Sequence, residues 1–468
     1  MPKKYHIKVS KADPRFTPIG KYATIEFRED CAGSCRACVK KACVYNIFKD
    51  NFTHWSNMES PEFLYICKSC YRCVEDCTKG IFSMAINPEY RTLGDDYWTA
   101  GIINTTWAQA HTGAIPVSGA GYRGKFAGEG FDSIWTDMSE IVRPTRDGIH
   151  GREYISTNVE LSRRPIRLKF NADATLATKE TPILEIPLPI TLLQPQFGVL
   201  SENVLLAIAS AAHEVDTLFF IQPESYTPAF QAYAANLVPC VTQANYQKYS
   251  SLIAASRMVE IADTPEIEKV IQALKHIKAD LFIAVALKLD AGAAERALEL
   301  SALPIDTLHF YGTQTGREAG AADPRYLKDM IREVHLKLVG GKVRNSINLI
   351  FAGGIAMAEH MAKAIICGAD AISIDIPLLI ALECRVCHLC KAGHACPVKL
   401  EAIEVKWGSQ RMVNLIGAWY NQLLEVMGAC GLREARRMRG EIGRSMWFED
   451  LEKDSFAPIF GTRKVKGI

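Results

Sequence analysis

The sequence of 468 residues predicts an α/β protein, in which a (β/α)8 barrel follows a small, cysteine-rich α+β domain. Strand-like apolar segments alternate with amphipathic helical segments from about residue 165 to about residue 375. Roughly eight such units in this length suit a closed parallel barrel better than an open sheet. Twelve of the 15 cysteines lie in three clusters of four, and two of these clusters precede the barrel. A chain of this length usually holds two or three domains.

The cysteines of residues 1–90 have the spacing of iron–sulfur ligands. The run "CKSCYRCVEDC" has the pattern C-x2-C-x2-C-x3-C that is typical of bacterial ferredoxins, and "CAGSCRACVKKAC" has the related pattern C-x3-C-x2-C-x4-C. In such runs three thiolates hold one cube and the fourth binds the other cube. We therefore predict a ferredoxin-like domain with two 4Fe–4S clusters, one held by Cys31, Cys35, Cys38 and Cys77, the other by Cys67, Cys70, Cys73 and Cys43.

Zinc is the alternative for these two runs, because paired C-x2-C sequences also build zinc ribbons. Zinc does not require three successive thiols followed by a fourth, so iron–sulfur is the favoured interpretation. One feature departs from the ferredoxin pattern, since Thr78 and Val44 occupy the positions where a proline usually follows the fourth cysteine.

Residues 91–168 are predicted to be a connecting segment rich in glycine and arginine. Its glycines permit a phosphate-binding loop, but no clear strand leads into them and no clear helix follows, so the match to a dinucleotide fingerprint is weak. The favoured interpretation is an ordered layer of ion pairs formed by Asp132, Asp137, Arg143, Arg146, Asp147 and Arg152.

The barrel is assigned to residues 169–400. The predicted strands lie within residues 183–193, 216–222, 258–263, 279–289, 305–312, 347–354 and 370–377. The predicted helices lie within residues 201–215, 265–277, 291–303, 323–342 and 357–368, the first of them capped by Ser201. Gly353 and Gly354 end a strand near the close of the barrel, where such folds commonly bind a phosphate. A tight turn that needs glycine for its shape alone explains them equally well.

The third cysteine cluster, "CRVCHLCKAGHACP", directly follows the last predicted strand. Its spacing is C-x2-C-x2-C-x5-C-P, and its members are Cys384, Cys387, Cys390 and Cys396. Zinc has more weight here because His388 and His394 are interleaved, but the cysteine triplet and the final Cys-Pro favour an iron–sulfur cluster. Residues 401–468 are predicted to form a charged helical tail whose arginines face water or pair with glutamates. The remaining residues, Cys240, Cys367 and Cys430, are expected to be small buried hydrophobes.

Composition excludes several classes of protein. The net charge of +2 gives no reason to expect binding to nucleic acid or to an anionic membrane. We find no apolar run long enough for a membrane span and no secretory signal, so we expect a cytoplasmic protein. Thiols stay reduced in that compartment, which makes metal binding a better explanation for the clusters than disulfides.

Several segments together resemble one known family. They are "WTDMSEIVRPTRDGIHGREYIST", "PQFGVLSENV", "AGGIAMAEHMAKAIICGADAISI", "RVCHLC…CPV" and "GLREARRMRGEIGRSMWFEDLE". These segments resemble the FMN-binding synthase domain of glutamate synthase, and most of all its short archaeal-type form with an N-terminal ferredoxin domain. The resemblance implies a (β/α)8 barrel that binds FMN beside an iron–sulfur cluster and reduces 2-iminoglutarate, formed from 2-oxoglutarate and ammonia, to L-glutamate. The family's barrel cluster is commonly 3Fe–4S, but the fourth thiol here favours 4Fe–4S, which makes three 4Fe–4S clusters in all.

The resemblance also implies roles for individual residues. Gly198 and Ser201 match the first flavin loop, Lys288 matches a lysine at the end of a middle barrel strand, and Gly353 and Gly354 match the phosphate loop. Lys288 is the candidate catalytic residue, because its ammonium can stabilise negative charge on the flavin or on a substrate carboxylate. A salt bridge in the barrel core is the competing role for Lys288.

The chain also departs from the family. The two Gly-Glu-Gly-Gly loops are missing, and "YGTQTG", residues 311–316, replaces an Asp-Gly-Gly-Thr-Gly loop. The N-terminal cysteine nucleophile of a glutaminase is absent, so we expect that ammonia is not made on this chain, and a separate glutaminase subunit is one candidate partner. Two hypotheses follow. The first is an oxidoreductase that passes electrons from a ferredoxin or another redox subunit through the clusters to FMN and on to an imine-type acceptor. The alternative is an electron-transfer subunit of a larger redox complex, whose barrel no longer makes glutamate.

Overall fold

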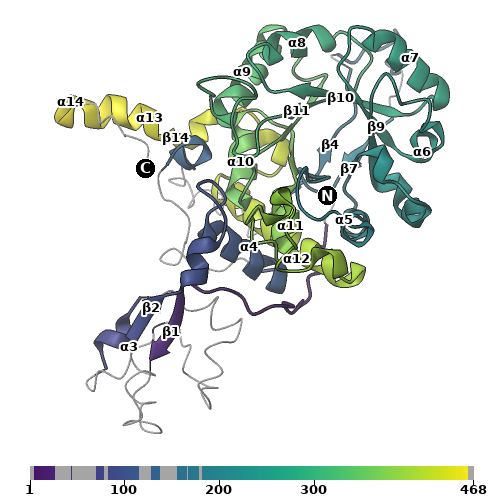
Figure 1. Ribbon diagram of the computed structural model, residues 1–468. Coiled ribbons are helices and arrows are strands. Elements are labelled where there is room, and N and C mark those ends of the chain that lie inside the picture. Colours follow the sequence, from purple (N-terminus) through teal and green to yellow (C-terminus); the bar gives the residue numbers. More distant parts are fainter. Residues whose placement is uncertain are drawn as a thin grey trace.

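The computed structural model describes residues 5–26, 44, 70–77, 83–114, 128–136, 155–165, 167–178 and 182–461. Eight parallel strands form a closed barrel, which confirms the predicted (β/α)8 barrel (Figure 1). Each strand pairs with the next along the chain, and the last pairs with the first. The strands are β6 (Ile190–Leu193), β7 (Phe219–Ile221), β8 (Leu237–Val241), β9 (Met258–Ala262), β10 (Phe282–Lys288), β11 (Thr307–Tyr311), β12 (Asn348–Ala352) and β13 (Ala371–Ile374).

Helices surround the barrel and cover the outward side chains of its strands. They are α5 (Glu202–Glu214), α6 (Ser250–Ala255), α7 (Ile267–Ile277), α8 (Ala293–Leu300), α9 (Leu327–Gly340), α10 (Ala358–Cys367) and α11 (Ile376–Ala381). Ser201 caps α5 as predicted, because its hydroxyl accepts a hydrogen bond from the amide of Val204 at 3.4 Å. Strand β8 and helix α6 were not among the predicted elements.

Strand β8 was missed because its sequence, "LVPCV", contains a proline. Proline has no amide donor and is unusual inside a sheet, so it argues against a strand. In the structure Pro239 lies opposite Ile221 of β7, and β8 still pairs with β9 through Cys240 and Val241. The barrel accommodates one missing donor because the rest of the ladder is intact.

A two-stranded antiparallel sheet closes the N-terminal end of the barrel. It is formed by β4 (Val159–Glu160) and β5 (Glu185–Ile186), and its apolar side chains pack with the inward-facing residues of the barrel. Thr307, the first residue of β11, donates its hydroxyl proton to the carbonyl of Leu161 at 2.8 Å. Access to the barrel interior is therefore left to the C-terminal ends of the strands.

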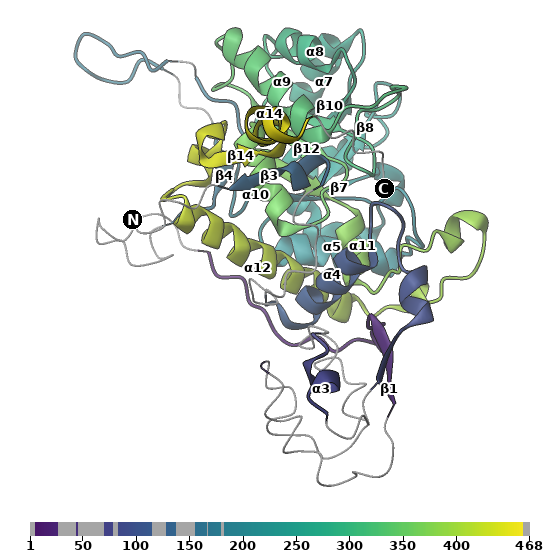
Figure 2. The same cartoon turned by 90° about the vertical axis from the view of Figure 1, so that its left-hand side faces the viewer.

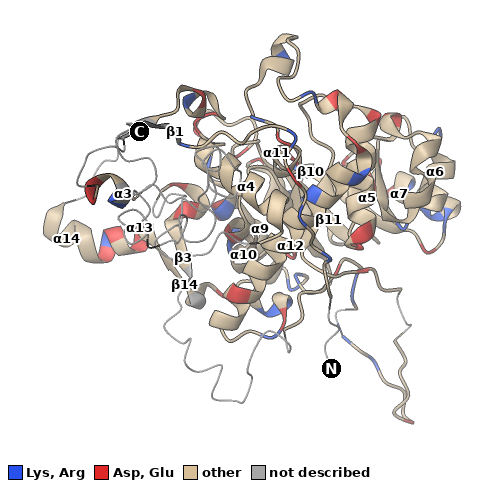
Figure 3. Cartoon of the chain, turned by 90° about the horizontal axis from the view of Figure 1, so that it is seen from below, with Lys and Arg blue, Asp and Glu red and all other residues tan. Residues whose placement is uncertain are grey.

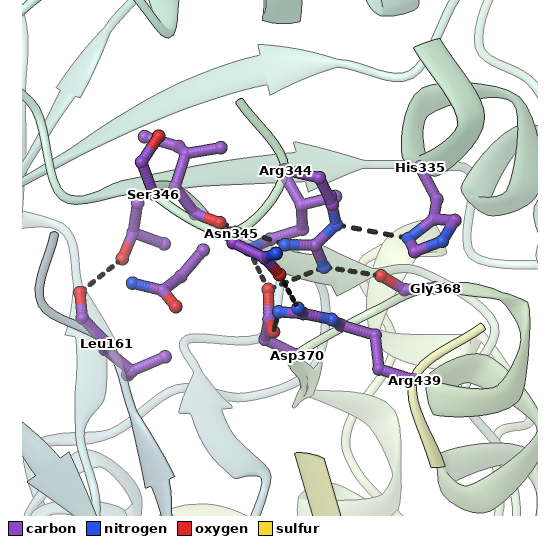
Figure 4. Close-up of polar contacts among 12 residues, drawn as sticks. Leu161, His335, Arg344, Asn345, Ser346, Gly368, Asp370 and Arg439 are labelled. Carbon is purple, nitrogen blue, oxygen red and sulfur yellow. Dashed lines mark hydrogen bonds and ion pairs between the residues drawn. The ribbon is translucent and has the colours of Figure 1, made fainter. Parts of the chain in front are cut away.

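A buried ionic cluster ties the C-terminal segment to this closed end (Figure 4). Asp370, just before β13, accepts hydrogen bonds from Arg344 and Arg439, each at 2.7 Å, and from the amide of Leu349 at 2.8 Å. Burial acts to raise the pKa of Asp370, but the two guanidinium groups outweigh it and hold that pKa below its ordinary value. His335, whose Nδ1 accepts a hydrogen bond from Arg344 at 3.1 Å, has its pKa lowered to about 4 by burial and by both arginines.

Two helices outside the barrel repeat lie against one another and against the barrel helices (Figure 2). Helix α12 (Val405–Ala429) belongs to the predicted tail and contacts α5, α10 and α11. Helix α4 (Ala100–Thr112) lies in the predicted connecting segment and contacts α11 and α12. Of the six residues predicted to form an ion-pair layer, the structure describes Asp132 alone, which lies 3.7 Å from the imidazole of His360.

The end of the tail is held to α9. Helix α13 (Phe448–Leu451) carries Glu449 and Asp450 and is marked by its acidic residues in Figure 3. Lys328 of α9 pairs with Glu449 at 2.8 Å and lies over the ring of Trp447. Of the tail arginines, Arg437 pairs with Glu434 as expected, but Arg439 departs from the expectation because it pairs with the buried Asp370.

The cysteine-rich domain is described in part. Strand β1 (Tyr22–Glu26) pairs antiparallel with β2 (Ser83–Ile86), and the two strands bracket both N-terminal cysteine runs in the sequence. Cys70 is exposed and Cys77 is half-buried, on either side of the short helix α3 (Arg72–Glu75). The side chains of the other six predicted ligands, Cys31, Cys35, Cys38, Cys43, Cys67 and Cys73, lie outside the described residues. The ferredoxin-like domain and its two clusters thus stay a prediction. In the described part of the chain, no helix combines the length and hydropathy that crossing a membrane requires.

Candidate functional site

Lys288 lies at the open mouth of the barrel. It is the last residue of β10 and is exposed. Side chains alternate along a strand, and Ala284 faces the barrel interior, so Lys288 lies on the same inner side. Its neighbour in register on β11 is Tyr311. Among the described residues Lys288 has no ion-pair partner, so they show no core salt bridge for it.

Gly353 and Gly354 are needed for the close packing of two mouth loops. They follow β12 with φ of 105° and 63°, a region that favours glycine. A Cβ atom on Gly353 would lie 2.6 Å from the carbonyl oxygen of Thr313, and one on Gly354 would lie 2.1 Å from the amide nitrogen of Gly316. The tight-turn interpretation of these glycines therefore has direct support.

The same glycine loop also has amides available for an anion. Within the described part of the chain, the N–H groups of Gly353, Gly354 and Ile355 donate no hydrogen bond, and α10 begins a few residues later. Free amides before a helix are what a phosphate group requires. The turn and the phosphate-loop interpretations are compatible at this position.

Two aromatic residues that the sequence reasoning missed cover these loops. The hydroxyl of Tyr97 donates to the carbonyl of Gly354, and the indole N–H of Trp98 donates to the carbonyl of Gln314 at 3.1 Å. Burial raises the pKa of Tyr97, which keeps its phenol neutral. The segment before α4 thus holds the loops after β11 and β12 together.

The third cysteine cluster surrounds a small cavity. All four thiols line it, together with Phe197 and Gly198 from the loop after β6. Gly198, at φ 103°, packs against Leu379 of α11. The structure therefore brings a predicted flavin-loop residue and the predicted metal ligands to one place beside the barrel mouth.

Four thiols are the number of ligands that either one iron–sulfur cube or one zinc ion takes. Among the described residues, no three Cys, His, Asp or Glu side chains converge tightly enough to hold one metal ion. A cube takes one thiolate at each iron corner, so its ligands stand apart around a cavity wall. Of the interleaved histidines, His388 contacts Asp95 through its Nε2 at 3.0 Å, while its buried Nδ1 has no hydrogen-bond partner among the described residues, so zinc stays the alternative here.

The backbone of the cysteine loop is strained. Four non-glycine residues have left-handed φ values, which are 75° at Glu383, 51° at Val386, 55° at His388 and 46° at Lys399. Such a conformation is a true outlier for a β-branched residue such as Val386, and strain of this kind gathers at functional sites. Its amide donates to Cys384 Sγ at 3.5 Å, a contact of the sort that tunes iron–sulfur centres.

The barrel interior also contains a polar cluster that the sequence reasoning did not single out. Glu260 of β9 and His309 and Tyr311 of β11 contact one another through hydrogen bonds, and Cys240 of β8 lies beside Glu260. Cys240 is therefore more than the small buried hydrophobe expected of it, while Cys367 and Cys430 are buried as expected. The signal in the sequence was a charged or ionisable residue inside each of two otherwise apolar predicted strands.

Comparison with known proteins gives one consistent result. Residues 243–433 match the family model described as the conserved region in glutamate synthase. The archaeal-type glutamate synthase [NADPH] of Dehalococcoides mccartyi is 23% identical over 478 residues, which cover 88% of this chain and 92% of that protein. The archaeal glutamate synthase [NADPH] of Archaeoglobus fulgidus is 24% identical over 499 residues, covering 92% and 95%.

Solved structures give a much weaker likeness. A mandelate oxidase with (S)-2-phenylpropionate shares 14% sequence identity at a TM-score of 0.39, covering 65% of this chain and 97% of that one. A likeness at this level supports no conclusion about chemistry.

Proposed function

We propose that this chain is an iron–sulfur flavoprotein oxidoreductase that binds FMN at its barrel mouth. Its resemblance to the glutamate synthase family suggests that it reduces an imine-type acceptor derived from 2-oxoglutarate. The observation that carries the proposal is the position of the third cysteine cluster, whose cavity shares Phe197 and Gly198 with the loop after β6. Relatives named glutamate synthase match nearly the full length of the chain, which supports the same reaction class.

The residues at the mouth fit FMN. The free amides of Gly353, Gly354 and Ile355 would hold its phosphate, and the ammonium of Lys288 would stabilise negative charge on its ring or on a substrate carboxylate. FMN, when bound, supplies hydride chemistry. The side chains themselves supply position, charge and exclusion of water.

The cysteine cavity fits a 4Fe–4S cluster. Cys384, Cys387, Cys390 and Cys396 would be its ligands, and the Val386 amide would donate to one of the ligand sulfurs. Burial and the neighbouring thiols raise the pKa of Cys384 to about 12, so the free thiol stays protonated until a metal displaces the proton. Two further clusters on the N-terminal cysteines would connect this centre to an external donor, either a ferredoxin or another redox subunit.

One observation favours the alternative of an electron-transfer subunit. The loop 312–316 packs directly against Gly353 and Gly354, and Tyr97 closes over them, which restricts the space at the phosphate position. In that alternative the barrel serves as a scaffold for clusters and holds no flavin.

The test is anaerobic purification of the full chain, followed by acid release of flavin and assay of iron and sulfide. We expect about one FMN and on the order of twelve iron atoms per chain. Cys390→Ser should lower the iron content by roughly a third, since it removes a ligand of one cube of three. Cys367→Ala, at a buried cysteine outside the clusters, is the matched control and should keep the full iron content.

Activity separates the two functions. The flavin-loaded protein, supplied with reduced methyl viologen, 2-oxoglutarate and ammonia, should form L-glutamate. Iron without flavin would replace the proposal with the electron-transfer alternative. Zinc with little iron would contradict both.

A further inference from the structure

Three side chains form a closed hydrogen-bonded cluster inside the barrel, immediately below its mouth. Nδ1 of His309 lies 2.6 Å from Oε1 of Glu260, and the hydroxyl of Tyr311 donates to Oε2 of the same carboxylate at 2.7 Å. The phenolic oxygen of Tyr311 is also 3.1 Å from Nδ1 of His309. The cluster therefore offers an unbroken set of contacts from Tyr311, at the end of β11, to an imidazole deep in the barrel.

The surroundings of the cluster leave one polar atom unused. Glu260 and His309 are buried, and Nε2 of His309 has no hydrogen-bond partner among the described residues. The ring of Phe220 packs against the imidazole, with centroids 4.6 Å apart. If His309 served only as a hydrogen-bond partner of Glu260, its Nε2 would be buried without a partner, which costs free energy. This cost suggests that Nε2 has a function.

We propose that Glu260, His309 and Tyr311 form a proton-transfer site, in which the Glu260–His309 pair stores one proton and Tyr311 passes it to a ligand at the barrel mouth. A proton on Nε2 converts the neutral imidazole to imidazolium beside a carboxylate, so the stored charge is compensated within the cluster. Tyr311 is half-buried at the end of its strand and lies in register with exposed Lys288, which places its hydroxyl at the boundary between the cluster and the mouth.

The transfer balances without an oxidant or reductant. The hydroxyl of Tyr311 turns from Oε2 of Glu260 toward the ligand, and its O–H bond breaks as its proton passes to a basic atom of the ligand. The phenolic oxygen then takes the Nδ1 proton of His309, which becomes neutral and keeps its Nε2 proton. Tyr311 ends as it began, the ligand has gained one proton, and no electron has moved.

Other ionisable groups face the cluster from the neighbouring elements. Cys240 lies beside Glu260 on β8, Lys288 is adjacent on β10, and Asp375 follows β13. Burial, reinforced by Glu260, raises the pKa values of both Tyr311 and Cys240, so each stays neutral and Tyr311 keeps its transferable proton. Burial raises the pKa of Asp375 to about 6. None of these groups replaces Tyr311 as the hydroxyl that contacts both Glu260 and His309.

The first test needs no flavin and no substrate. The full chain is labelled with ¹⁵N-histidine, and the Nδ1–H resonance of His309 is identified by its loss in His309→Gln. Transfer through Tyr311 predicts that exchange of this proton with water slows at least tenfold in Tyr311→Phe. Tyr233→Phe, a half-buried tyrosine on the 3₁₀ segment Pro228–Asn236, is the matched control and should leave the exchange rate unchanged. A purely structural cluster predicts unchanged or faster exchange in Tyr311→Phe, and that result would overturn the proposal.

The second test uses the flavin-loaded enzyme and rests on the proposed function. Tyr311→Phe should lower kcat for glutamate formation by about 10²- to 10³-fold with KM changed less than twofold, because acid–base groups contribute in this range. An unchanged kcat in a flavin-loaded variant would contradict the proton-transfer proposal but would leave the proposed function standing. Absence of flavin from the wild-type protein would contradict the proposed function. The exchange measurement on the His309 proton would still decide whether Glu260, His309 and Tyr311 transfer a proton.

Discussion

Replacing Asp370 with asparagine should destabilise the barrel far more than removing a surface charge. Asparagine keeps the shape of the side chain, so no cavity is made and the change isolates the charge. Asp370 is 7% exposed and holds Arg344, which is 3% exposed, and Arg439. Breaking a buried pair leaves an uncompensated charge, which costs about 3–5 kcal/mol. Because Arg344 keeps its bonds to the carbonyls of Ile347 and Gly368, we place the loss near 3 kcal/mol, at the lower end of that range.

The measurement is the free energy of unfolding from guanidinium titration, followed by tryptophan fluorescence. The matched control is Asp263→Asn, whose carboxylate pairs with Arg296 in a more open setting. Exposed pairs contribute about 0.2–1 kcal/mol, so the control should lose less than about 1 kcal/mol. A loss in Asp370→Asn no larger than in the control would refute the reasoning that this cluster fastens the tail to the barrel.

The same substitution has a pH signature. The folded-state pKa of Asp370 lies below its ordinary value of 3.8, so the unfolded chain binds the proton first as the pH falls. The contribution of Asp370 to the free energy of unfolding is therefore complete above about pH 4 to 5, and it is lost as the pH falls through the folded-state pKa. The difference in the free energy of unfolding between wild type and Asp370→Asn should be constant near neutral pH and should decrease in acid.

Two further predictions address neighbouring features. His335 has a folded-state pKa of about 4 against an ordinary 6.5, so the unfolded chain takes up its proton first as the pH falls. The free energy of unfolding should therefore decrease between pH 6.5 and pH 4. In His335→Gln, denaturation measured at a series of pH values should show a smaller decrease over this range. Gly354→Ala should weaken FMN binding at least tenfold in a fluorescence titration of the apoprotein, because its Cβ would lie 2.1 Å from the amide nitrogen of Gly316. Gly320→Ala, also at positive φ but with open space around it, should bind FMN like wild type. An equal loss of FMN affinity in both variants would contradict a role in FMN binding for the loop that contains Gly354.

The barrel could be predicted because its strands are short, apolar and regularly spaced, whereas the site depends on neighbours in space. Lys288 and Tyr311 are 23 positions apart in the sequence, and only the parallel pairing of β10 with β11 makes them adjacent. Sequence motifs identified the glycines after β12, but the collision that requires glycine there comes from the loop after β11. The glycine- and arginine-rich composition around α4 likewise concealed a helix whose buried face becomes apparent only against α12.

The position of the buried polar cluster bears on the choice between an enzyme and an electron carrier. Tyr311 begins "YGTQTG", the loop in which this chain departs from the Asp-Gly-Gly-Thr-Gly pattern of the family it resembles. Electrons move between iron–sulfur clusters without protons, so a scaffold that only carries clusters has no use for an ionisable triad at the barrel mouth. Reduction of an imine adds a proton as well as a hydride, and a proton donor beside the exposed Lys288 meets that need. If the proposed function holds, the altered loop marks a changed route for the proton, and the kcat of Tyr311→Phe decides between that change and loss of the reaction.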